Sequence, residues 1–98
     1  MSLSQFFETG TVVATRQIHE KMQKSGYFTA EIYIALKRYC VKNWGDCGEE
    51  FKEINDYAIK KGNERIMGTY ETIFGEIWIV TEGPADDRVT TVLFPGDN

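Results

Sequence analysis

The hydrophobic pattern of the chain changes its period near residue 65, and this change limits the possible folds. Up to that point apolar residues recur at intervals of three or four, as on helices. Beyond it, three short runs at 65–72, 76–82 and 88–95 have the composition of strands. The middle run, EIWIVTE, contains four consecutive apolar residues, which is typical of a strand covered on both faces. We therefore predict an antiparallel meander with residues 76–82 at its centre.

The first two thirds of the chain predict one short strand and three helices. The β-branched run TVVAT at 11–15 indicates the strand. Thr15, Thr29 and Asp46 are residue types that cap helix N-termini, and Gly26 and Gly62 are typical of helix ends. Glu49 follows Asp46 by three residues, as in a capping box. In the third helix we expect Phe51, Ile54 and Ala58 to share the core face.

These elements combine into an α+β fold of order β-α-α-α-β-β-β. Three helices pack on an antiparallel three- or four-stranded sheet, and the strand at 11–15 joins an edge or crosses the other side. The length of 98 residues predicts a single domain. We expect about 1–9 and 96–98 to be loose termini, and we assign no role to residues 1–3.

Composition restricts the classes of partner. The chain carries 15 acids against 11 bases, a net charge of −4, which disfavours a nucleic-acid groove as the main binding surface. It has no run approaching the ~20 apolar residues of a membrane helix and no apparent signal peptide. Two cysteines are too few for a disulfide framework. We expect a cytoplasmic protein with reduced thiols and no membrane partner.

The stretch KNWGDCGEEFKEIND at 42–56 has the most unusual composition in the chain. Amides at a helix N-terminus would favour a thiolate at Cys47, but the neighbouring acids favour the neutral thiol. The single histidine, His19, lies on another segment, and the spacing of the cysteines does not suit zinc. Since no phosphate loop or nucleophile motif is present either, we predict no enzymatic activity, no catalytic residues, no cofactor and no metal.

Two residues of this stretch have two possible roles each. Asn55 lies beside the apolar face, so it either ties the helix to the backbone of the sheet or anchors a ligand in a groove. Trp44 either closes over the core or forms an exposed contact. We favour the structural role for both. As candidate contacts for a protein partner we name Trp44, Asp46, Asn55 and Arg88.

The alternative function is accessory nucleic-acid binding. Lys60, Lys61 and Arg65 cluster around the end of the third helix and the start of the next strand, where they could form a basic patch. Lysines late in a helix are also ordinary complements of the helix dipole.

Four stretches together carry a family resemblance: WGD at 44–46, IND at 54–56, EIWIVTE at 76–82 and DRVTTVLFP at 87–95. They resemble short, largely uncharacterised, plasmid-related proteins of Gram-positive bacteria and their mobile genetic elements. The turn containing GPAD is longer here than in that pattern. The resemblance implies an accessory role, so we expect a small non-enzymatic protein that binds and modulates a host or element protein. The sequence leaves the oligomeric state open, and exposed edge strands with a marginal core are compatible with a homodimer.

Overall fold

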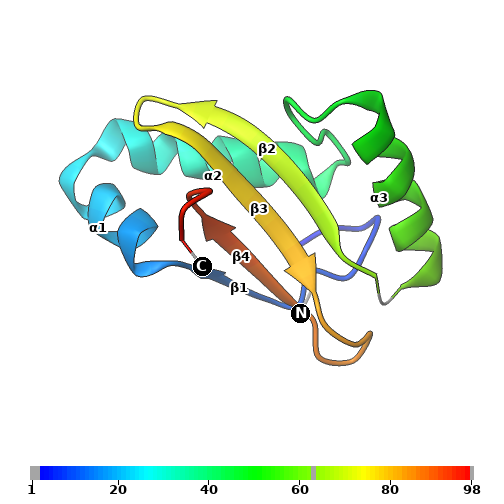
Figure 1. Cartoon of the computed structure of the whole chain (residues 1–98). Coiled ribbons are helices and arrows are strands. Elements are labelled where there is room, and N and C mark those ends of the chain that lie inside the picture. Colours follow the sequence, from blue (N-terminus) through cyan, green and yellow to red (C-terminus); the bar gives the residue numbers. More distant parts are fainter. Residues whose placement is uncertain (1–2, 63, 98) are drawn as a thin grey trace.

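The computed structural model describes residues 3–62 and 64–97, and it confirms the α+β class and the order of the elements (Figure 1). The elements are β1 (Thr11–Ala14), α1 (Arg16–Lys24), α2 (Gly26–Cys40), α3 (Glu49–Lys61), β2 (Ile66–Thr72), β3 (Gly75–Glu82) and β4 (Val89–Leu93). In the view of Figure 1, α2 passes behind β2 and β3, α1 lies to the left of the sheet, and α3 lies to the right, beside β2. Among the described residues, no helix lies across the front face of the sheet.

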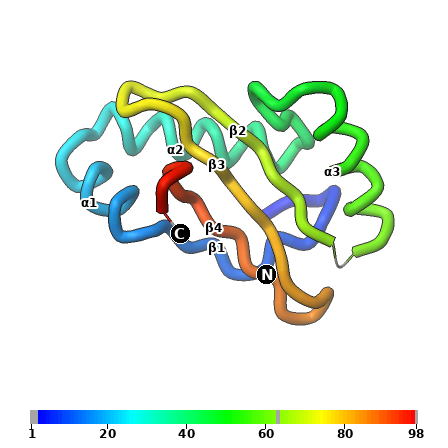
Figure 2. The backbone as a smooth tube through the Cα atoms, in the orientation of Figure 1, coloured from blue at the N-terminus to red at the C-terminus, as the bar shows by residue number. Residues whose placement is uncertain are grey.

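The four strands form one sheet in the order β1-β4-β3-β2, so β3 lies between two neighbours as its apolar run predicts. Strand β3 pairs antiparallel with both β2 and β4. Strand β1 instead joins the edge parallel to β4, which makes the sheet mixed. The Thr11 N–H donates to the Arg88 carbonyl at 3.2 Å, and the Thr15 N–H donates to the Val92 carbonyl at 3.0 Å. Figure 2 shows β1 beside β4 at this edge of the sheet.

The core fills the space between the helices and the covered face of the sheet. Alternate residues of the strands point into it, including Ile66, Tyr70, Ile77, Ile79 and Val92. The helices contribute Ile18, Phe28, Ile32, Ala35, Tyr39 and Ala58. Aromatic rings from distant segments also meet there: Phe7 and Trp44 lie 5.4 Å and 5.3 Å from Tyr39, measured between ring centroids. The core therefore depends on the N-terminal segment as well as on the regular elements.

Of the five expected helix ends, those at Thr15, Gly26 and Gly62 are confirmed, and those at Thr29 and Asp46 are wrong. Thr15 caps α1 by accepting from the Ile18 N–H, and Gly62 ends α3 with φ 82°. Helix α1 ends at Lys24 with Ser25 as its C-cap, so Gly26 lies just past its end as expected, and Gly26 is also the first residue of α2. Ser25 caps α2, so Thr29 is not a cap. Ser25 is also the C-cap of α1, which lets the two helices follow each other without a loop. The Thr29 hydroxyl donates to the Met22 carbonyl at 2.9 Å.

Asp46 does not cap α3, contrary to the capping-box prediction. The N-cap is Gly48, whose lack of a side chain leaves the helix without a side-chain cap. The reason is a tertiary contact: the Asp46 N–H donates to the Thr69 carbonyl at 2.8 Å, and Gly45 forms a parallel bridge with Thr69. The backbone at 44–46 thus pairs with the edge of β2, and this pairing ends before α3 begins at Glu49.

The described parts of the expected loose termini are tied to the body of the protein. The Ser4 hydroxyl donates to the Cys40 carbonyl at 2.7 Å, and Thr9 is only 1% exposed. At the other end, the Thr15 hydroxyl donates to the Asp97 carboxylate at 2.7 Å. Residues 1, 2 and 98 lie outside the described part of the chain.

Candidate functional site: the groove between α3 and β2

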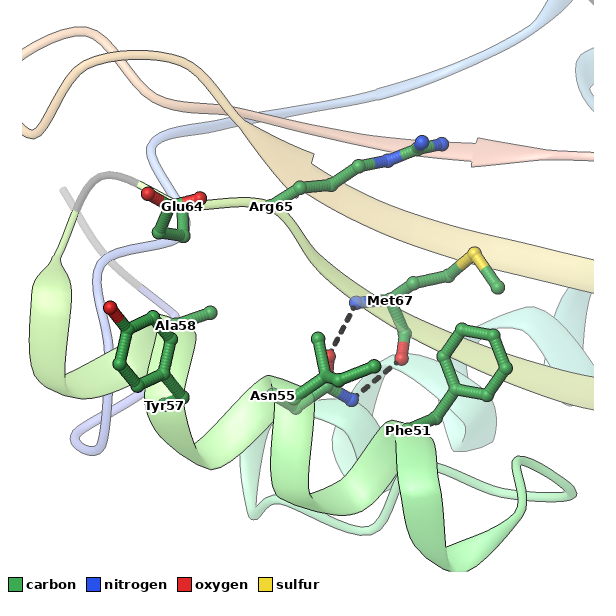
Figure 3. A pocket seen from close by; sticks show the side chains of 8 residues that line it. Phe51, Asn55, Tyr57, Ala58, Glu64, Arg65 and Met67 are labelled. Carbon is green, nitrogen blue, oxygen red and sulfur yellow. Dashed lines mark hydrogen bonds between the residues drawn. The ribbon is translucent and has the colours of Figure 1, made fainter.

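A shallow groove with a mainly apolar lining runs between α3 and β2 (Figure 3). Its volume is about 260 Å³, and it is lined by Phe51, Ile54, Asn55, Tyr57, Ala58, Glu64, Arg65 and Met67. Phe51, Ile54 and Tyr57 are 43%, 56% and 58% exposed, although the first two were expected in the core. Of the predicted apolar face, only Ala58 is buried. The prediction of a core face at 51, 54 and 58 is therefore largely wrong.

The position of Asn55 explains why α3 presents Ile54 and Tyr57 to solvent, whereas Phe51, four residues before Asn55, lies on the same side of the helix as Asn55. Its side-chain Nδ2 donates to the Met67 carbonyl at 2.8 Å, and the Met67 N–H donates to its Oδ1 at 3.1 Å (Figure 3). One amide thus replaces a neighbouring strand at this point of the edge of β2. Asn55 is 1% exposed, so it must face the sheet, and this fixes the rotation of α3. The expected tie between Asn55 and the backbone is confirmed, and the same residue lines the groove.

The apolar surface continues from the groove onto the uncovered face of the sheet. Met67 lies on that face opposite Val80, which in turn pairs with Thr91. In the next row, Trp78 lies between Thr69 and Leu93. Both rows lie away from the helices, and Trp78 is half-buried. On this face Met67 and Trp78 add partly exposed apolar surface to the groove, whereas Val80 and Leu93 are only 2% and 9% exposed.

This surface ends at a pair of like charges. Glu71 of β2 and Glu76 of β3 are register partners on the uncovered face, and both are exposed. The Glu76 carboxylate accepts from the Trp78 indole N–H at 2.8 Å. Two carboxylates directly opposite each other repel and destabilise the sheet. A cation bound at this position would remove that repulsion.

The three residues of the predicted nucleic-acid patch are all exposed and lie around the same turn of the chain. Lys60 and Lys61 end α3, and Arg65 precedes β2 at one end of the groove. The Lys61 ammonium lies 5.7 Å from the centre of the Tyr57 ring. Glu64 sits beside Arg65 in the groove lining, and α3 carries exposed acids such as Glu53 and Asp56. The positive charge is therefore interrupted by negative charge.

Trp44 belongs to the core and is not an exposed contact. It is 2% exposed, its ring lies 5.8 Å from that of Phe7, and its carbonyl accepts from the Thr69 N–H at 3.0 Å. This confirms the structural role and removes Trp44 from the candidate contacts. The Asp46 side chain is exposed, while its backbone is fixed to β2.

Arg88 is also buried, at 4% exposure, which removes it from the candidate contacts. Its Nη1 donates to the Gly83 carbonyl and its Nη2 to the Glu64 carbonyl, both at 2.7 Å. The guanidinium therefore holds the loop after β3 against the loop after α3. Sequence reasoning missed this role because burial of a single arginine has no local sequence signal.

A chain of hydroxyl groups crosses the core, and the sequence analysis did not predict it. The Tyr39 hydroxyl pairs with that of Thr81 at 2.7 Å, Thr81 pairs with Thr90 at 2.7 Å, and Thr90 donates to the Thr9 carbonyl at 2.7 Å. Burial raises the pKa of Tyr39 well above its ordinary value, against the opposing effects of Thr81 and Arg88. Within the sheet, the hydroxyl chain follows from the pairing of β3 with β4, which makes Thr81 and Thr90 register partners.

The cysteines form no catalytic arrangement with the other residues described. The Cys47 thiol contacts the Met67 carbonyl at 3.7 Å, and burial raises the pKa of the Cys40 thiol. His19 is exposed on α1. Among the residues that the structure describes, no group of three or more His, Cys, Asp or Glu could hold a metal ion. Within 3–62 and 64–97, no helix has the length and apolar character needed to cross a membrane.

Comparison with known families, curated proteins and solved structures found no match to this chain. The resemblance to plasmid-related proteins therefore stays a prediction.

Proposed function

We propose that this chain is a non-enzymatic module that binds a protein partner along the groove between α3 and β2. The observation that carries the proposal is the exposure of Phe51, Ile54 and Tyr57, three large apolar side chains on one side of α3. Exposed apolar side chains grouped around a groove are typical of interaction sites, whereas isolated ones are not. An apolar segment laid in the groove would bury them.

Charge indicates the chemistry of the partner segment. Beyond Met67, the uncovered face of the sheet carries the half-buried Trp78 and then the exposed pair Glu71 and Glu76. A segment that follows β2 would place one end over these two carboxylates, where a lysine or arginine would relieve their repulsion. We therefore propose that the bound segment has an apolar face and at least one basic residue at that end. Modulation of a host or mobile-element protein, as the resemblance implies, would require binding of this kind.

The experiment combines capture with direct titration. Tagged wild-type chain and an Ile54→Lys variant are used to recover partners from cell lysate, with Gln23→Lys on the exposed side of α1 as the control. The recovered partner is then purified and titrated calorimetrically against each variant. We expect Ile54→Lys to weaken binding by about tenfold or more, since it places a charge in an apolar interface, and Gln23→Lys to have no effect.

The proposed chemistry of the partner is tested by neutralising the acids. The double variant Glu71→Gln/Glu76→Gln should weaken binding and reduce its dependence on salt concentration. Equal affinities of the wild-type chain and Ile54→Lys for the purified partner would contradict the proposed site.

Nucleic-acid binding through Lys60, Lys61 and Arg65 is the alternative, and it has less support. The three cations share the surface with Glu64, and the wider sheet face carries Glu71 and Glu76. Affinity for a phosphate backbone rises with the number of Lys and Arg contacts to phosphates, and neighbouring carboxylates oppose such contacts. Gel shifts at low and moderate salt, with the wild-type chain and with all three residues changed to alanine, distinguish this alternative from protein binding.

A further inference from the structure

Strand β1 is an edge of the sheet that has no neighbour on its outer side among the described residues. The N–H groups of Thr11 and Thr15 donate inward to β4. Because backbone groups alternate in direction along a strand, those of Val12 and Ala14 point outward. Thr11, Val13 and Ala14 are exposed, and Val13 is 43% exposed. An outward row of donors and acceptors beside exposed apolar residues is a template for another strand.

The charges that flank β1 indicate which strand would fit. Glu8 precedes the strand, and Arg16, whose side chain is 90% exposed and pairs with Glu20 at 3.1 Å, follows it. A second copy paired antiparallel about Val12 would place Thr11 opposite Val13, and it would bring the end of β1 near Glu8 to the end near Arg16 of the other copy. The same charge pair would form twice, once at each end, because the arrangement has a twofold axis. A parallel arrangement would instead bring like charges together.

We propose that two copies of this chain associate through β1, antiparallel and with the twofold axis at Val12, to form a continuous eight-stranded sheet. Val12 pairs with its own counterpart and exchanges both backbone hydrogen bonds with it. Gly10, with φ 63°, bends the chain immediately before β1 and limits the pairing to a short segment. The surface used is separate from the α3–β2 groove, so this proposal does not depend on the proposed function.

Cysteine cross-linking tests the register of this pairing. Across the axis, two Val12 Cα atoms would lie about 5.5 Å apart, within the range that a disulfide spans. Two Val13 Cα atoms would be offset by two residues and about 8 Å apart, outside that range. Under mild oxidation we expect Val12→Cys to form a covalent dimer and Val13→Cys and the wild-type chain, with its native Cys40 and Cys47, to form far less. Equal cross-linking of both variants, or none of Val12→Cys, would overturn the proposal.

Charge reversal provides a second test that does not alter the backbone. Sedimentation velocity over a concentration series should show wild-type chain of 11.2 kDa moving toward twice that mass. Glu8→Arg or Arg16→Glu alone should weaken the dimer by about tenfold, because each creates like-charge pairs at both ends. The double variant Glu8→Arg/Arg16→Glu should restore it.

Proline at Val12 isolates the contribution of the outward N–H. Val12→Pro removes a donor that faces away from β4, so circular dichroism should show a folded chain that sediments as a monomer. Ile54→Lys, in the groove, should dimerise like the wild-type chain. A wild-type chain that stays monomeric throughout, or a double charge variant that does not recover dimerisation, would refute the twofold arrangement.

Discussion

The two edges of the sheet differ in how their outward backbone groups are paired. Along β2, Met67 exchanges hydrogen bonds with the Asn55 amide, and Thr69 exchanges them with Trp44 and Asp46. Along β1, the structure places no element beyond the strand within the described chain. One edge is closed by a side chain and a loop segment, and the other is available to a further strand.

This difference shows that an edge can be closed without an additional strand. A single buried asparagine supplies the donor and the acceptor that a neighbouring residue would otherwise supply. Its cost is a fixed rotation of α3, which leaves the apolar side chains Ile54 and Tyr57 outside the core. Closure of the β2 edge and exposure of the groove are therefore consequences of the same contact.

The largest loss of stability is expected when Arg88 is replaced, because this residue makes contacts at both edges of the sheet. Its carbonyl accepts from Thr11 in β1, and its guanidinium holds the Glu64 carbonyl just before β2. Arg88→Ala should lower the free energy of unfolding by about 3 kcal/mol, since two hydrogen bonds from a buried charge are lost. Urea denaturation measures the loss. Arg65→Ala, at an exposed position, is the control and should change the stability by less than about 0.5 kcal/mol. Equal midpoints for the two variants would show that the buried guanidinium is not a clamp.

Replacing Asn55 should make the β2 edge resemble the β1 edge. Asn55→Ala leaves the Met67 N–H and carbonyl without their partner and should cost about 2 kcal/mol. Hydrogen exchange followed by NMR should show much faster exchange of the Met67 amide. Lys52→Ala, on the exposed side of α3, is the matched control. A Met67 amide that stays equally protected in Asn55→Ala would mean that other contacts close this edge.

A smaller effect is expected at Tyr70, whose hydroxyl donates to the Asn43 carbonyl at 2.7 Å and so supports the loop that closes β2. Tyr70→Phe should cost about 1 kcal/mol near neutral pH. Denaturation at a series of pH values, with exposed Tyr33→Phe as the control, measures this cost and the pH dependence that follows.

The pH dependence has a defined sign. Burial raises the pKa of Tyr70 and of Tyr39 in the folded chain. The unfolded chain, with ordinary tyrosines, loses these protons first, at about pH 10. The stabilisation is therefore fully present below about pH 10 and is lost as the pH rises above it. Tyr70→Phe removes one of the two groups and should flatten the alkaline decline, whereas an unchanged slope would contradict its burial.

The smallest change in the free energy of unfolding is expected for a substitution in the groove between α3 and β2. Ile54→Lys changes a side chain that is 56% exposed, so the free energy of unfolding should change by less than about 0.5 kcal/mol. Ala58→Lys, only one turn away but buried, should destabilise the fold strongly. Thermal denaturation of both variants compares the two sides of α3. A large loss in Ile54→Lys would place this residue in the core, as the periodicity originally indicated.

Local patterns predicted the parts of the fold that depend on local chemistry. The apolar run at 77–80 predicted the central strand, and Thr15 and Gly62 predicted helix ends. Asp46 failed as a cap because a contact with Thr69, distant in sequence, holds its backbone elsewhere. Such contacts compete with local preferences and have no local signal.

The candidate site was only partly predictable for the same reason. The polar Asn55 beside an apolar face correctly predicted a tie to the sheet. With Asn55 facing the sheet, Ile54 lies at the edge of the buried face of α3 and is exposed. The burial of Arg88 and the hydroxyl chain from Tyr39 to Thr9 depend on side chains from several elements and could not be inferred from spacing.

The parallel pairing of β1 with β4 has a consequence for synthesis. Thr90 reaches the Thr9 carbonyl across 81 residues, and Thr15 reaches Asp97 across 82. The ribosome makes strand β1 well before it makes β4, the neighbour of β1 in the sheet. Contacts between such distant segments slow folding, because a long loop must close before they form. Until β4 emerges, both sides of β1 lack a strand, so the nascent chain is most prone to associate with other chains before β4 is complete.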